Sequence, residues 1–171
     1  YTYLLDTYKE NDLTYDSYNK GKLEAQLAYH GNYKAYFEFI ADSLKRYSSQ
    51  RDKQKGEAFV HGFTLAMTSQ NQFYRPISEL DNDGGYADIF LSPLCDIYKD
   101  MVDSYIIELK YCKTNTADEQ LQVLFKEASA QICRYANSDI VKESVKTTKL
   151  HKLVVIYRGA EMVMCEEITE E

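Results

Sequence analysis

The sequence predicts an α/β fold in which a mixed β-sheet is flanked by helices and preceded by a helical lead-in. In the first third of the 171-residue chain, apolar residues recur three and four positions apart, as on one face of a helix. From Phe73 onward they gather in short runs bounded by turn formers, as in strands. A strand–helix–strand order in the second half predicts two parallel neighbours joined by a right-handed crossover.

The lead-in contains two expected helices, and a third precedes the sheet. Apolar residues within 23–28 form a short stripe that ends at Gly31. A longer stripe at helical spacing occupies residues 33–47. The third helix is expected to start within residues 51–56. Its predicted buried face consists of Phe59, Phe63, Ala66 and Met67.

Three strands are expected after these helices. Residues 74–79 and 86–91 form the first two. The turn between them is Asp-Asn-Asp-Gly-Gly at 81–85, which supplies glycine where φ is positive. The third strand, residues 105–111, is expected at the centre of the sheet because the crossover places a parallel neighbour beside it.

A helix and two more strands complete the predicted core. The capping box Thr116-Ala-Asp-Glu119 marks the start of the helix, which is expected to end near Asn137. Strands are expected at 151–157 and 161–167, separated by a turn at Arg158-Gly159. The predicted buried face of the helix consists of Leu121, Leu124, Phe125, Ala128, Ile132 and Tyr135.

Size and composition are those of an ordinary globular protein, with 44% hydrophobic and 27% charged residues. We expect residues 1–50 to form the helical lead-in and residues 51–171 the α/β core. No apolar run reaches the roughly 20 residues that span a bilayer, and four scattered cysteines indicate reduced thiols, so we expect a cytoplasmic protein without membrane contact. The chain begins at Tyr1 and not with Met, so we expect an excised piece of a longer protein.

The net charge of -7 argues against non-specific adhesion to nucleic acid through the whole surface. One local stretch is basic, since five Lys or Arg residues lie between Lys142 and Arg158 with Glu143 as the only acid among them. Such a stretch is most often solvated surface, and contact with a polyanion is the alternative.

Charged residues interrupt the predicted third strand, YIIELKYCK. Because side chains alternate along a strand, Glu108 and Lys110 share a face, with Cα atoms about 6.6 Å apart. Asp88 lies on the preceding strand, so the three side chains can converge at one end of the sheet. Two carboxylates that meet there favour a bound cation, and oxygen ligands suit a hard ion such as Mg²⁺. With Lys110 to stabilise charge on a phosphate, this set predicts phosphodiester hydrolysis. A solvated strand end or an internal ion pair is the plainer alternative for Glu108 and Lys110.

The segments GGYADIFLSP, SYIIELKYCK and EASAQICRYA resemble the PD-(D/E)XK nuclease superfamily. More closely, they are similar to the nuclease-like domain at the C-terminus of bacterial AAA-ATPase-like proteins. The resemblance covers about residues 22–167. It implies a restriction-endonuclease-like three-layer sandwich and nucleic acid, DNA above all, as the partner. An upstream ATPase domain is a further implied partner, and a homodimer is compatible with the family.

The resemblance also implies roles for residues on the strands. Asp88 and Glu108 would bind the metal ion, Mg²⁺ with Mn²⁺ as a substitute, and Lys110 would be the catalytic lysine. Close relatives often carry Arg two positions before the Asp, whereas this chain has Tyr86. Glu79 could line the site, although an acid at a strand end is the commoner case.

Two helices are expected to add residues to the same site. Glu57, before the sheet, matches an acidic residue that many members place beside the metal, and a surface ion pair with His61 four positions on is equally consistent. Gln131 matches the glutamine of the family's QxxxY pattern, which Tyr135 completes. All three histidines are interpreted as structural or surface residues: His30, His61 and His151.

Two functions follow from the residues and the resemblance. The first is a Mg²⁺-dependent nuclease, coupled to an ATPase domain that this chain lacks, since no GxxxxGK[ST] motif is present. The second is a nuclease-fold interaction or regulatory module with weak or no cleavage activity. The acidic net charge and Tyr86 favour the second, whereas the intact set of Asp88, Glu108 and Lys110 favours the first.

Overall fold

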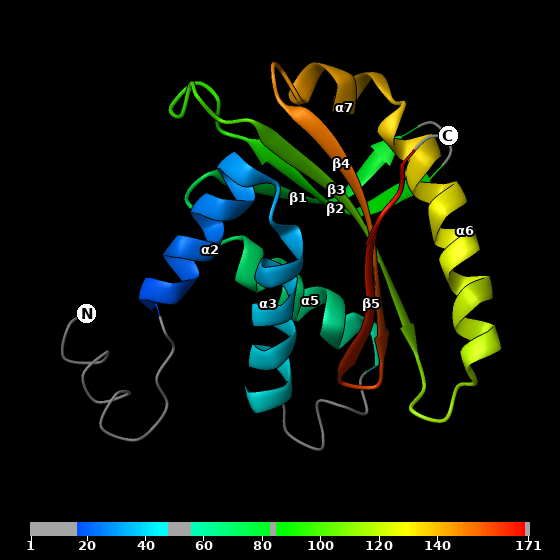
Figure 1. The fold of residues 1–171 in the computed structure, drawn as a ribbon. Helices are drawn as coiled ribbons and strands as arrows, with labels where there is room; N and C mark the ends of the chain where they lie inside the picture. Colours follow the sequence, from blue (N-terminus) through cyan, green and yellow to red (C-terminus); the bar gives the residue numbers. More distant parts are fainter. Residues whose placement is uncertain (1–16, 48–55, 83–84, 170–171) are drawn as a thin grey trace.

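The computed structural model describes residues 17–47, 56–82 and 85–169. Its strands form one mixed sheet in the order β1-β2-β3-β4-β5, with helices on both faces, so the described chain has three layers (Figure 1). The third strand lies at the centre, as predicted. The architecture is the α/β restriction-endonuclease-like sandwich that the sequence predicts, with helices ahead of the sheet.

The two helices of the lead-in form as expected. α2 (Ser17–His30) and α3 (Tyr33–Tyr47) coincide with the two apolar stripes. Gly31 between them has a φ of 64°, a backbone conformation that glycine adopts without strain. Both helices bury side chains in the same apolar layer as the sheet, including Leu27, Tyr36 and Phe37.

The third helix, α5 (Glu57–Thr68), starts just after the predicted range, of which residues 51–55 lie outside the described chain. Its buried face differs from the prediction. The buried residues are Val60, Thr64, Met67 and Thr68. Phe59 and Phe63 are only partly buried, and Ala66 is exposed. The threonines can be buried because each hydroxyl donates to a carbonyl one turn earlier, at 2.8 Å and 2.9 Å.

The strands lie where the sequence places them, with longer ends. β1 (Tyr74–Asn82) and β2 (Gly85–Pro93) form an antiparallel hairpin that extends into the predicted turn, so the turn is shorter than expected. β3 (Asp103–Cys112) pairs in parallel with β4 (Lys149–Arg158), which confirms the crossover. β5 (Glu161–Glu167) matches the predicted range and pairs antiparallel with β4.

The crossover helix α6 (Asp118–Ala136) forms without the predicted capping box, and that prediction is wrong. The N-cap is Ala117, and no side chain caps the helix. Instead, Nη1 of Arg158 donates to the Thr116 carbonyl at 3.2 Å and to Asp118 Oδ1 at 2.7 Å. A contact from the end of β4 therefore holds the start of the helix.

Each face of the sheet has its own apolar layer. α2, α3 and α5 cover one face, and α6 covers the other together with the short α7 (Asp139–Ser144), which the sequence did not predict. β3 alternates between the two layers. Its residues in the first layer are Tyr105, Ile107 and Leu109, and those in the second are Ile106 and Cys112. By this alternation Glu108 and Lys110 belong to the α6 face.

A buried histidine links three strands near the first residues of β3 and β4. Nε2 of His151 lies 2.8 Å from Asp103 Oδ1, and Nδ1 lies 2.9 Å from Glu167 Oε1. The ring stacks on Tyr105 with centroids 4.9 Å apart. This histidine is structural, as expected, and His30 is exposed on the surface.

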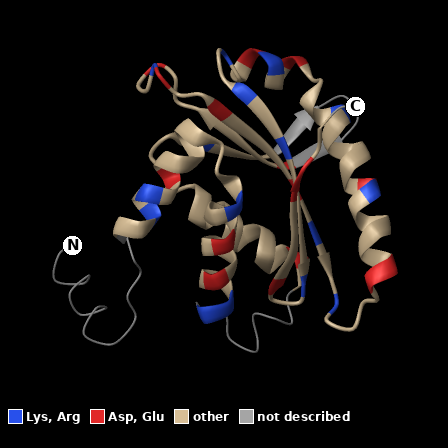
Figure 2. Ribbon diagram, in the orientation of Figure 1, with Lys and Arg blue, Asp and Glu red and all other residues tan. Residues whose placement is uncertain are grey.

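The basic stretch is spread over α7 and along β4 (Figure 2). Lys142 lies on α7, whereas Lys149 and Arg158 lie at opposite ends of β4. Three of its members have acidic partners: Lys146 with Asp96 at 3.7 Å, Lys149 with Glu167 at 3.8 Å, and Arg158 with Asp118 at 2.7 Å. Lys149 is in register with Asp103, seven residues before Lys110, and so lies about 23 Å from it along the sheet.

Two further expectations concern cysteines and membrane spans. All four cysteines are free, and Cys112 and Cys165 are buried. Burial raises the pKa of the Cys165 thiol to about 12, so this thiol stays protonated and unreactive. Within the described ranges, no helix combines the length and the apolar character that crossing a bilayer requires.

Candidate active site

The sheet opens between β2 and β3, and the predicted strand residues lie at this opening. The two strands pair only from Ile89 to Leu91 with Tyr105 to Ile107. Asp88 and Glu108 are the next residues beyond the last pair. α5 packs against β1, β2 and β3 at this point. The opening therefore lies next to α5 and has one carboxylate on each of its two strands.

Glu108 and Lys110 form a buried ion pair on one face of β3. Nζ of Lys110 donates to Glu108 Oε1 at 2.8 Å. The Glu108 side chain is 3% exposed and the Lys110 side chain 21%. The second oxygen of Glu108, Oε2, is buried and accepts no hydrogen bond from the described residues. Because buried polar atoms are normally satisfied, this oxygen is suited to bind a cation.

The protonation of the site reflects burial and mutual repulsion. Burial is the main cause that raises the pKa of Glu108 from 4.5 to about 7; Asp88 adds to the increase, and Lys110 opposes it. Burial acts to lower the pKa of Lys110. The hydrogen bond to Glu108 and the negative charges of Glu108, Asp88 and Glu57 together have a larger effect, so the pKa of Lys110 is raised. Near neutral pH, Lys110 is therefore cationic and Glu108 is close to half protonated.

Asp88 is held by both its carboxylate and its backbone. Oδ2 accepts a hydrogen bond from the Leu109 N–H at 2.7 Å. The Asp88 carbonyl oxygen lies 3.1 Å from Nε2 of His61. Burial raises the pKa of Asp88, while the Leu109 hydrogen bond and the Lys110 charge oppose the increase.

A pocket of about 430 Å³ adjoins these residues. It is lined by Glu57, Ala58 and His61 of α5 and by Asp88 and Leu109 of the two strands. Glu57 is exposed, and beyond the effect of burial its charge raises the pKa of Asp88 and of Glu108. Glu57 therefore belongs to the same electrostatic cluster as the strand carboxylates.

His61 is the residue of this pocket that sequence reasoning missed. The sequence interpretation made it a structural or surface residue, yet it lines the pocket and contacts the Asp88 backbone. The available signal was its spacing of one helical turn from Glu57, which places both side chains on one face of α5. That spacing predicted an ion pair between them as readily as a shared pocket.

The remaining predicted site residues have fewer contacts described in the structure. Gln131 lies on α6, which covers the face that carries Glu108, and its Oε1 is buried without a hydrogen-bond partner among the described residues. Tyr135 is buried in the apolar layer under the same helix. The side chains of Tyr86 and Glu79 lie outside the described part of the chain.

The carboxylates do not form a metal cage by themselves. Among the described residues, no three His, Cys, Asp or Glu side chains come close enough together to hold an ion. The predicted trio of Asp88, Glu108 and Glu57 is thus not assembled as three direct ligands. Two carboxylates at the opening, one of them with a free buried oxygen, make up the donor set that the strands supply.

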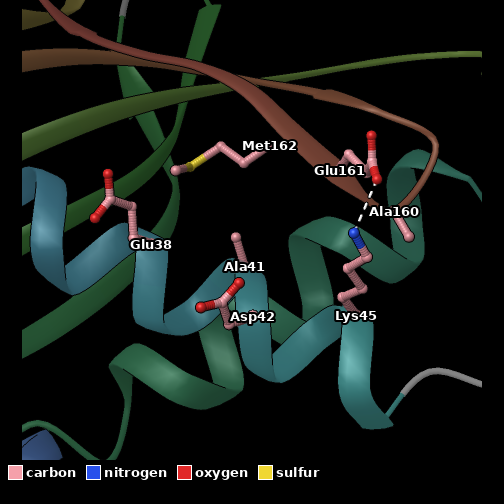
Figure 3. A pocket seen from close by; sticks show the side chains of 7 residues that line it. All are labelled: Glu38, Ala41, Asp42, Lys45, Ala160, Glu161 and Met162. Carbon is pink, nitrogen blue, oxygen red and sulfur yellow. Dashed lines mark hydrogen bonds and ion pairs between the residues drawn. The ribbon is translucent and has the colours of Figure 1, made fainter.

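A second pocket, of about 360 Å³, lies between α3 and the start of β5 (Figure 3). Its lining residues are Glu38, Ala41, Asp42, Lys45, Ala160, Glu161 and Met162. Lys45 donates to Glu161 Oε1 at 2.9 Å across it. This pocket shares no residue with the first and contains none of the predicted site residues.

The fold and the site together define a class of protein. A mixed sheet with helices on both faces, an aspartate at the end of one strand pairing and a Glu-x-Lys on the central strand fit a restriction-endonuclease-like enzyme that hydrolyses phosphodiester bonds. Residues 55–167 match the family model for the PD-(D/E)XK nuclease superfamily, and the chain belongs to that superfamily. Its members typically use divalent metal ions. Neither the curated proteins nor the solved structures contain a match to the chain.

Proposed function

We propose that the chain is a Mg²⁺-dependent deoxyribonuclease in which Mn²⁺ can replace Mg²⁺. The observation that carries the proposal is the buried Glu108, whose Oε2 has no partner within the described residues while Lys110 binds Oε1. With Asp88 across the strand opening, this arrangement supplies two anionic oxygens and one cation to a single point of the sheet. Membership of the nuclease superfamily supports nucleic acid as the substrate.

The donor set fits a hard divalent cation. Mg²⁺ is commonly held by one or two carboxylates and otherwise by waters and substrate phosphates, so a pair of carboxylates is sufficient. We assign Asp88 and Glu108 as direct metal ligands. Glu57, exposed in the pocket wall, is the third acid and would contribute through water. When bound, the ion would supply Lewis-acid stabilisation of the negative charge on the phosphate.

The chain's own residues then have distinct tasks. Lys110 stays protonated at neutral pH and stabilises the charge that develops on the phosphate in the transition state. Glu108 must lose its proton before it can bind a cation, and its pKa is raised in the metal-free protein, so metal binding and cleavage should increase as the pH rises. Gln131, with its buried Oε1, would orient a water or a phosphate oxygen from α6.

The proposal extends to the protein's context. The resemblance to nuclease-like domains of bacterial AAA-ATPase-like proteins supports an ATPase domain upstream of this chain, with cleavage driven or regulated by it. DNA is the proposed substrate on the same basis. The basic stretch of residues 142–158 gives no added support, because its described members lie on separate elements and several are ion-paired.

The test is a cleavage assay on plasmid, linear and single-stranded DNA with Mg²⁺ or Mn²⁺. Lys110→Ala should lower the turnover rate by about 100- to 1000-fold with little loss of DNA binding, because the lysine acts on charge that appears in the transition state. Lys99→Ala, an exposed lysine in the β2–β3 connection, is the matched control and should cleave like the wild type. If the wild type cleaves nothing with either metal and binds DNA no better than Lys110→Ala, the interaction-module function replaces this proposal.

A further inference from the structure

The backbone at Asp88 lies just beyond the end of the pairing between β2 and β3. On the β1 side, Ser78 pairs with Ile89 and Leu80 with Ala87, so the register places Asp88 opposite Glu79. The pairing between β2 and β3 ends one residue away, at Ile89. A half-buried carbonyl outside a ladder needs another donor, because a buried carbonyl without a hydrogen bond lowers stability.

His61 supplies that donor from α5. Its Nε2 lies 3.1 Å from the Asp88 carbonyl oxygen. Because a carbonyl oxygen only accepts hydrogen bonds, Nε2 must carry the hydrogen. Ser78 Oγ lies 3.5 Å from the same nitrogen, at the limit of a hydrogen bond, so the carbonyl is the principal acceptor.

The helix that carries His61, α5, packs tightly against the sheet on both sides of this residue in the sequence. Val60, the residue before it, is 4% exposed, and Thr64, one turn later, is fully buried. Both lie on the face of α5 that packs on the sheet. The position of the ring therefore follows from the packing of the helix and not from a mobile loop.

We propose that His61 is a positioning residue for Asp88. Its hydrogen bond fixes the backbone of β2 where the pairing with β3 has ended, and with the backbone fixed the carboxylate reaches the Leu109 N–H at 2.7 Å. The inference rests on the proposed function, in which Asp88 binds the metal ion. Groups that orient metal ligands typically change metal affinity or activity by about 10- to 100-fold.

The test compares two substitutions that differ in one hydrogen-bond donor. The amide nitrogen of Gln reaches nearly the position of Nε2, so His61→Gln should retain the bond, whereas His61→Leu removes it. Calorimetric titration with Mn²⁺ should show affinity weakened by about 10- to 100-fold in the Leu variant and nearly restored in the Gln variant. His30→Leu, the same change at an exposed histidine, should leave the affinity unchanged.

Amide hydrogen exchange gives a readout that needs no metal. The Leu109 amide, which donates to the Asp88 carboxylate, should exchange roughly tenfold faster in His61→Leu and at the wild-type rate in His61→Gln. If His61→Leu does not fold, His61→Asn takes its place, since the shorter amide does not reach the carbonyl. Unchanged exchange at Leu109 in the donor-free variant, or equal acceleration in the Gln variant, would overturn the inference. A wild type that binds no Mn²⁺ would instead remove the proposed metal function, while the exchange result still decides the role of His61.

Discussion

Glu108→Gln should stabilise the metal-free protein at alkaline pH. Glutamine keeps the shape of the neutral acid, and its oxygen can still accept from Lys110. The pKa of Glu108 is raised from 4.5 in the unfolded chain to about 7 in the fold, because the carboxylate is buried. At about 1.4 kcal/mol per pKa unit, the ionised side chain lowers the free energy of unfolding by about 3 kcal/mol above pH 7.

The sign of the pH dependence follows from the raised pKa. Below pH 4.5 the carboxyl is neutral in both states and the penalty is absent, and as the pH rises through about 7 the penalty becomes complete. Lys110 loses an ionic partner in the variant, so we expect a net gain of about 1–3 kcal/mol near pH 8. For a chain of this size, each kcal/mol corresponds to about 2–4 °C in Tm.

The assay is thermal unfolding followed by circular dichroism, in chelator, at about pH 5 and about pH 8. The stability gap between Glu108→Gln and the wild type should widen by about 2 kcal/mol between the two conditions. Glu57→Gln, an exposed acid of the same pocket, is the control and should show little change in the gap. A variant that is no more stable than the wild type near pH 8, or a gap that is equal at both conditions, would refute this account of Glu108.

The remaining predictions concern a turn, the basic stretch and the metal. Gly159→Ala should lower the free energy of unfolding by about 1–3 kcal/mol in urea titration, because φ is 65° and an added Cβ would lie 2.7 Å from Thr114 Oγ1. Gly21→Ala is the control: Gly21 lies inside a helix, and an added Cβ there would have no atom within 4 Å, so this variant should be more stable than the wild type. Lys149→Ala should leave the single-turnover rate on a short oligonucleotide unchanged, since it lies about 23 Å from Lys110 along the sheet, and a tenfold loss would contradict that geometry. A chelator should abolish cleavage and added Mg²⁺ should restore it, and cleavage that persists in chelator would exclude a metal-dependent mechanism.

Much of the fold could be predicted from local pattern. The strand period places Glu108 and Lys110 on one face, and their hydrogen bond at 2.8 Å agrees with it. The crossover rule required a parallel neighbour for β3, which β4 provides. These features depend only on the spacing of side chains within one element, or on the order of elements along the chain.

The errors have both local and long-range origins. The buried face of α5 was mispredicted because Thr64 counts as polar in a periodicity, although its hydroxyl is satisfied by the Val60 carbonyl at 2.8 Å. The predicted capping box is absent, and the side-chain contact at the start of α6 comes from Arg158, 40 residues from Asp118 along the chain. The contact of His61 with the Asp88 carbonyl depends on how α5 sits against β2, and no local pattern contains that information.

The buried histidine of β4 has a consequence for how this fold can change over time. Each ring nitrogen of His151 has its own carboxylate, from Asp103 and Glu167, so losing one acid leaves a buried nitrogen without its partner. Replacing all three by apolar residues of similar volume avoids that penalty. The effects of substitutions at the three positions on the free energy of unfolding should therefore be strongly non-additive in a mutant cycle. In diverging relatives, substitutions at Asp103, His151 and Glu167 should occur together, although the three residues lie on three different strands.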